Sequence, residues 1–151
     1  MKKKLVMPFG SPREQYRSEA TIIWCSDARF ALSFQVFQEK MGWKNFDLLK
    51  IDGGARDLGT LGSETEREYV LGQIGKSLKL HHSPEIFLMV HYNCGAFNHE
   101  QMDPSDEEDR FFTAELNQAK NNVEQYLAAN GLKASVRLLL LDFKNIYEVE
   151  R

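Results

Sequence analysis

The sequence contains only two cysteines in 151 residues, four prolines and no long apolar run. Two cysteines cannot form a disulfide framework, so a metal-binding or catalytic role is favoured for them. No window approaches the roughly 18 apolar residues of a membrane-spanning helix, and we therefore expect no membrane partner. The net charge is -3, the pI is about 5.8 and both signs of charge are mixed along the chain. This balance argues against a nucleic-acid partner.

The N-terminus carries three lysines at 2–4, but only three apolar residues follow them before Pro8. That run is too short for the apolar core of a signal peptide, and we expect a cytoplasmic protein. The apolar fraction of 42% and the charged fraction of 27% are ordinary for a globular domain. The length favours a single domain over residues 1–151, in which residues 1–20 form a polar lead-in segment.

Short apolar segments alternate with segments of helical periodicity. The apolar segments have the continuous character of buried parallel strands, and they cover residues 21–24, 46–51, 86–90 and 136–141. The helical periodicity covers residues 32–41, 64–80 after a capping-box pattern, and 112–127. This alternation predicts an α/β fold, a three-layer sandwich around a mainly parallel four-stranded sheet. The acidic residues 103–109 are expected to form a solvated loop, and 142–151 a polar tail with room for a short edge strand.

The residues with metal-binding chemistry follow two of the predicted strands. Cys25 ends the first strand, whereas His91 ends the third and Cys94 lies three residues beyond it. In parallel sheets ligands bind outside the carboxyl ends of the strands where the strand order reverses, so these residues converge if the two strands are neighbours. Thiolate and imidazole ligands suit Zn²⁺, and three protein ligands leave a fourth position open, as in catalytic sites. Taken singly, each cysteine is more often a small buried apolar residue.

Two charged residues follow Cys25 at alternate positions. Asp27 is close enough in sequence to approach the same ion, and Arg29 can hold Asp27 ionised through a charge-assisted pair. If Asp27 were released from Arg29, it could become a fourth metal ligand and close the site. On their own, Asp27 and Arg29 would more often form a modest surface ion pair.

The pattern Cys25-x-Asp27-x-Arg29 followed by His91-x-x-Cys94-Gly95 resembles the zinc signature of the β-class carbonic anhydrases. The resemblance implies Zn²⁺ bound by Cys25, His91 and Cys94. It also implies reversible hydration of carbon dioxide to bicarbonate by a zinc-bound hydroxide that Asp27 and Arg29 orient. A homodimer or a multiple of dimers is the implied assembly.

One loop departs from the family pattern. The segment Ile51-Asp52-Gly53-Gly54 lacks the arginine that the family has after the second strand, and it has an aspartate where an asparagine is usual. We therefore expect the polarity of the pocket near this loop to depart from the family pattern.

Three other functions remain open from the sequence. The site could hydrolyse a related small molecule such as COS or CS₂, or it could be a non-catalytic zinc site with a structural or sensing role. A third alternative is a redox switch between Cys25 and Cys94. His99 is a weaker candidate for proton transfer, on the general ground that histidine titrates near neutrality.

Overall fold

The computed structural model describes residues 1–97 and 106–150. This part of the chain forms a five-stranded sheet in the order β2-β1-β3-β4-β5. The strands are β1 (Thr21–Cys25), β2 (Asp47–Ile51), β3 (Glu85–His91), β4 (Ser135–Leu141) and β5 (Ile146–Glu148). The four predicted parallel strands are confirmed, and β5 adds an antiparallel edge strand beside β4.

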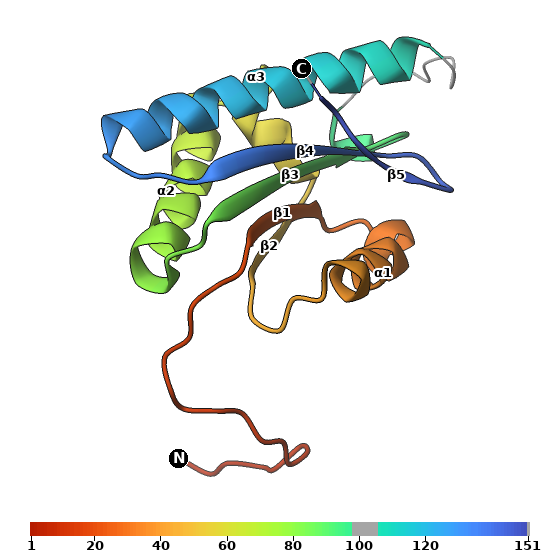
Figure 1. The fold of residues 1–151 in the computed structure, drawn as a ribbon. Coiled ribbons are helices and arrows are strands. Elements are labelled where there is room, and N and C mark those ends of the chain that lie inside the picture. The colour runs from red at the N-terminus through yellow and green to blue at the C-terminus, as the bar shows by residue number, and fades with distance from the viewer. Residues whose placement is uncertain (98–105, 151) are drawn as a thin grey trace.

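Three helices cover the two faces of the sheet. They are α1 (Ala31–Met41), α2 (Glu64–His81) and α3 (Glu107–Ala129). Figure 1 shows α1 on one face and both α2 and α3 on the other, which is the predicted three-layer arrangement. It follows from right-handed crossovers, because the chain moves one way along the sheet from β1 to β2 and the opposite way from β2 to β3 and β4. No helix among the described residues is both long and apolar enough to cross a membrane.

The core fills both faces of the sheet, between the sheet and the α2–α3 layer and between the sheet and α1. Every residue of β1 is buried, and so is β3 from Ile86 onward, as their uninterrupted apolar sequences predict. The residues of α3 at helical spacing are also buried; they are Phe112, Leu116, Ala119, Val123 and Leu127. The predicted capping box starts α2, where Ser63 and Glu66 exchange hydrogen bonds. The helical spacing of apolar residues in the sequence therefore identifies the face of α3 that packs on the sheet.

Two expectations about the helices need correction. The helical spacing of apolar residues over 32–41 rests on Leu32, Val36 and Phe37, and of these only Phe37 packs against the core, whereas Leu32 and Val36 are 69% and 54% exposed. Phe34 joins Phe37 on the side of α1 that meets the core, and their rings lie 5.2 and 6.0 Å from that of Trp24. Aromatic rings bury the larger apolar area, so they take the inner side.

The second correction concerns the acidic run at residues 103–109. Residues 103–105 lie outside the described part of the chain, but Glu107–Asp109 form the first turn of α3 rather than a solvated loop. Glu108 is only 4% exposed there. Negative charge is favourable at a helix N-terminus, which explains why an acidic segment starts a helix.

The lead-in segment has neither helix nor strand before β1, and Figure 1 shows its first part running away from the sheet. Its end is tied down by hydrogen bonds from Tyr16 Oη to Asp47 and from the Ser18 N–H to the carbonyl of His81 at 2.8 Å. Asp47 also accepts from Ser77 and lies 2.8 Å from His81 Nδ1. The bond to Asp47, together with burial, raises the pKa of Tyr16 to about 12.

The arrangement of the strands brings two distant segments to one edge of the sheet. β1 pairs in parallel with both β2 and β3, so the strand order reverses between β1 and β3. Directly after β2, Gly54 has a φ of 58°, and a side chain there would overlap the carbonyl oxygen of Met89 in β3. The absence of a side chain at Gly54 thus lets this loop approach the backbone of β3. The carboxyl ends of β1, β2 and β3 meet at this point.

Candidate metal centre

The three candidate metal ligands lie together at the reversal of strand order. Cys25 is the last residue of β1, His91 is the last residue of β3, and Cys94 lies in the turn that leads to a short 3-10 helix, η3 (Gly95–Phe97). One ligand atom from each lies within 4.8 Å of the other two. All three residues are nearly inaccessible, with exposures of 2%, 0% and 3%. The structure therefore brings together residues that are far apart in the sequence.

The His91 ring is oriented so that one nitrogen faces the cluster without a partner. Its Nδ1 lies 2.7 Å from the carbonyl oxygen of Tyr92, which can only accept, so Nδ1 carries the proton. Phe30 stacks on the ring with a centroid distance of 4.0 Å. Nε2 therefore has a free lone pair, and this atom is buried with no hydrogen-bond partner in the described part of the chain. A bound metal ion would satisfy it, since ligating histidines commonly fix their other nitrogen in this way.

The two sulfur atoms supply the negative charge of the ligand set. A hydrogen bond from Cys94 lowers the pKa of the Cys25 thiol, and the same bond together with burial raises the pKa of Cys94. Tetrahedral zinc with Zn–S distances of about 2.3 Å holds its sulfur ligands about 3.8 Å apart. The spacing of the cluster and its two-sulfur, one-nitrogen chemistry fit Zn²⁺.

Asp27 and Arg29 form a tight ion pair beside the ligands. Arg29 donates from Nη2 to Asp27 Oδ2 at 2.6 Å and from Nε to both carboxylate oxygens at 3.0 and 3.1 Å. These bonds lower the pKa of Asp27 to about 2. Asp27 Oδ2 also lies 3.8 Å from His91 Nε2, so the carboxylate borders the cluster while it is held by Arg29. Its service as a fourth ligand in a closed state stays a prediction.

A cavity of about 400 Å³ gives access to the cluster. Its lining includes Cys25, Asp27 and Cys94 together with Asp52 and Gly53 of the loop that departs from the family pattern. Asp52 accepts a hydrogen bond from the hydroxyl of Ser26. The cavity is thus large enough for a small molecule and has a second carboxylate at its wall.

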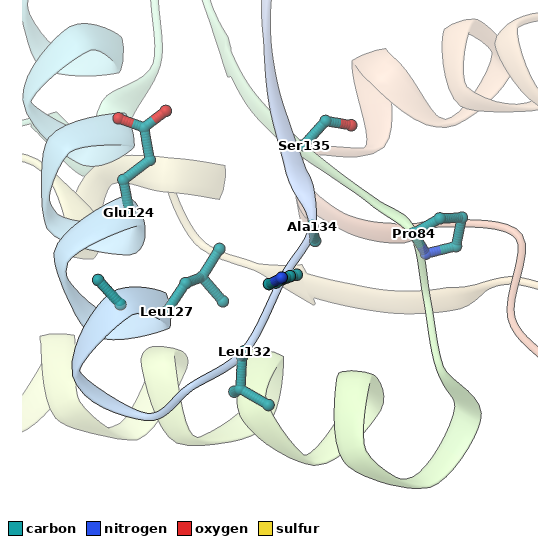
Figure 2. Close-up of a pocket in the computed structure, with 8 residues that line it drawn as sticks. Pro84, Glu124, Leu127, Leu132, Ala134 and Ser135 are labelled. Atoms are coloured by element: carbon teal, nitrogen blue, oxygen red, sulfur yellow. The ribbon is translucent and has the colours of Figure 1, made fainter.

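A hollow of about 560 Å³ lies elsewhere, and Figure 2 shows its lining from α3 and from the segment before β4. Pro84 precedes β3 and Ser135 begins β4, so this hollow lies at the amino ends of these strands, opposite the metal cluster. Among its lining residues only Glu124 and Lys133 carry charge. It offers no group of ligands or nucleophiles and plays no part in the site.

Comparison with known proteins identifies the fold. No protein-family model and no curated protein sequence matches the chain. The structure is similar to β-carbonic anhydrase isoform I of Trichomonas vaginalis, with a TM-score of 0.61 and 14% identity over 93% of this chain and 87% of that one. A Coccomyxa β-carbonic anhydrase in complex with acetazolamide gives 0.57 and 14%, over 90% and 73% of the two chains. A tetrameric β-carbonic anhydrase of Sordaria macrospora gives 0.54 and 15%, over 90% and 82%. The chain therefore has a β-carbonic anhydrase-like α/β fold with a divergent sequence.

Sequence reasoning missed two residues that shape the cluster. Phe30 stacks on His91, and no pattern in the sequence distinguishes it from other core aromatics. Asn93 has a φ of 53°, and an asparagine between two candidate ligands is a readable signal for such a left-handed turn. His99, the candidate for proton transfer, lies outside the described residues.

Proposed function

We propose that the protein catalyses the reversible hydration of carbon dioxide to bicarbonate with Zn²⁺ held by Cys25, His91 and Cys94. The observation that carries this proposal is the buried three-ligand cluster with the Asp27–Arg29 pair beside it. The fold adds support, because the similar solved structures are β-carbonic anhydrases.

The residues of the site have separate roles in this reaction. Zinc, when bound, supplies a Lewis acid that lowers the pKa of water to about 7 and so provides a nucleophile near neutral pH. Water adds to the carbon of carbon dioxide and one proton is released, which leaves bicarbonate. Asp27 stays ionised through its bonds with Arg29, so its carboxylate is available to accept a hydrogen bond from the nucleophile and orient it. The cavity walls at Ser26 and Asp52 border the space for the substrate.

The proposal extends to the domain organisation, the assembly and the cellular compartment of the protein. Residues 1–151 would act as one domain, as a homodimer or a multiple of dimers. The large exposed fractions of Leu32, Val36 and Phe143 support self-association, because they surround a groove of about 460 Å³ between α1 and the β4–β5 loop. Light scattering after size-exclusion chromatography tests this assembly. The free thiols of Cys25 and Cys94 suit a reducing compartment such as the cytoplasm.

The test of the catalytic proposal is stopped-flow hydration of carbon dioxide by zinc-loaded protein. Cys25→Ser should lose both stoichiometric zinc and activity, whereas Arg29→Ala should keep zinc and lose activity by about 100-fold, within the usual range for an orienting group. Arg137→Ala is the matched control, since Arg137 forms a similar two-point pair with Glu148 at 2.7 and 2.8 Å, away from the cluster. This control should retain full activity.

The outcomes separate the alternatives. Zinc bound at one ion per chain without hydration at any pH would contradict the proposal. Turnover of COS or CS₂ by the same protein would then identify a related hydrolase. No turnover of any of these substrates would favour a non-catalytic zinc site.

A further inference from the structure

The guanidinium group of Arg29 is held on two sides. Besides its bonds to Asp27, it donates from Nη1 to the side-chain oxygen of Asn93 and from Nη2 to the carbonyl oxygen of Asn93, each at 3.0 Å. Asn93 lies between two of the metal ligands, and its φ of 53° turns both oxygen atoms toward Arg29. The position of Arg29 therefore depends on the geometry of this turn.

The turn itself is held by a buried carboxylate from another layer of the fold. The N–H of Asn93 donates to Glu108 Oε1 at 2.7 Å, and Glu108 is only 4% exposed. A buried carboxylate is costly unless it is hydrogen-bonded, and the N-terminus of α3 helps to stabilise its charge. A second bond, from Tyr92 Oη to Asp109 at 2.9 Å, joins the same two segments. The first turn of α3 thus fixes the turn that carries Asn93.

These contacts form one continuous chain from α3 to the metal cluster. We propose that Glu108 and Asn93 are positioning residues that hold Arg29, and through it keep Asp27 away from the metal ion. The proposal rests on the metal-binding part of the proposed function. It assigns to Glu108 a role separate from stability of the fold, because the residue that it holds, Asn93, in turn holds Arg29.

Breaking this chain of contacts would release Asp27 next to the metal ligands. Asp27 Oδ2 is already 3.8 Å from His91 Nε2, so a small rotation brings the carboxylate to the ion that His91 would hold. A carboxylate binds zinc at about 2.0–2.2 Å and would fill the open coordination position. Loss of the Glu108 carboxylate should therefore close the metal site through Asp27.

The test uses cobalt(II)-substituted protein, because the visible absorption of cobalt reports whether an added anion reaches the metal. Thiocyanate is titrated into the parent and into variants at residue 108. Glu108→Ala should weaken thiocyanate binding by about tenfold or more, the usual effect of removing a group that orients a ligand. Glu108→Gln keeps an oxygen that can accept from Asn93 and should bind like the parent. Glu107→Ala is the matched control, because Glu107 is the exposed acidic neighbour in the same helical turn.

The double variant Glu108→Ala with Asp27→Ala separates positioning from a general structural effect. If Asp27 closes the site, removing its carboxylate should restore thiocyanate binding to the parent level. A general loosening of the turn would not be reversed by this change. If Glu108→Ala fails to fold, Asn93→Gly tests the next contact of the chain, because glycine tolerates the left-handed turn but lacks the side-chain oxygen that accepts from Arg29 Nη1. It should weaken thiocyanate binding in the same direction.

Several results would overturn the proposal. They are unchanged thiocyanate binding in Glu108→Ala and Asn93→Gly, a loss that the Asp27→Ala change does not restore, and a parent protein that binds cobalt but no thiocyanate. A parent that binds no cobalt would overturn the metal assignment as well. If the parent binds thiocyanate and the variants behave as expected but carbon dioxide is not hydrated, the proposed reaction fails while the positioning role stands.

Discussion

The loop after β2 offers a direct test of how closely the site is packed. Gly54 has a φ of 58°, and an added Cβ would overlap the carbonyl oxygen of Met89 and lie 3.2 Å from its carbonyl carbon. Met89 is fully buried in β3 and is paired with Leu139 of β4, so its backbone has little freedom to move away. Gly54→Ala therefore combines an unfavourable backbone conformation with a clash against the centre of the sheet.

The two contributions can be separated with a second glycine. Gly42 has a φ of 70° but open space around it, so Gly42→Ala measures the conformational cost alone, about 1–2 kcal/mol for a left-handed residue with a side chain. The clash at Gly54 should add about 1–3 kcal/mol, as forced insertion into a packed core does. We expect Gly54→Ala to lower the free energy of unfolding by about 2–5 kcal/mol in total.

The assay is urea unfolding followed by circular dichroism, with metal removed so that zinc binding does not contribute. The comparison of Gly54→Ala with Gly42→Ala decides the result. Equal destabilisation by the two changes would refute the reasoning, since it would mean that the backbone of Met89 moves aside at no cost. A Gly54→Ala protein that does not fold, beside a folded Gly42→Ala protein, would agree with it.

Three further predictions concern the phenol of Tyr16, a second buried carboxylate and the metal. Folding raises the pKa of Tyr16 from 10.0 to about 12. The stabilisation that the neutral phenol provides is therefore complete below pH 10 and is lost as the pH rises toward 12. In unfolding experiments, Tyr16→Phe should reduce the fall in the free energy of unfolding over this pH range. Glu115 is 5% exposed and accepts from the N–H of Thr60 at 2.9 Å, so Glu115→Ala should cost about 1–3 kcal/mol in thermal or urea unfolding by leaving that donor unpaired. Zinc at 100 times its dissociation constant should stabilise the protein by about 2.7 kcal/mol, and calorimetry should show no such effect in Cys94→Ser.

The strands and the cluster of candidate metal ligands were accessible to sequence reasoning because the signals are local. β1 and β3 are short apolar runs, and Cys25 and His91 end them directly. In parallel sheets ligands gather where the strand order reverses, so the two segments should meet if the first and third strands are neighbours. The pairing of β1 with β3 shows that they are. Local pattern and topology together were therefore enough to bring the candidate ligands to one place.

The parts that escaped prediction depend on contacts between distant segments. The helical period of α1 was correct, but the choice between Leu32 and Phe34 for the inner side depends on the ring of Trp24. Glu108 lies in an acidic run whose composition suggests solvent exposure, and only the position of α3 over the β3 end buries it beside Asn93. A charge that pairs with a backbone N–H from another layer leaves no trace in sequence periodicity.

The separation of the ligands along the chain has a consequence for folding kinetics. His91 and Cys94 are close in sequence, but Cys25 joins them only after β1 has paired with β3, and this pairing must close the loop that contains α1, β2 and α2. Before that step the chain presents only two of the three candidate ligands, and two ligands would bind zinc less firmly than three. The rate at which refolding protein takes up metal at all three positions should therefore equal the rate at which β1 pairs with β3. Metal uptake would then report the rate of this non-local step of folding.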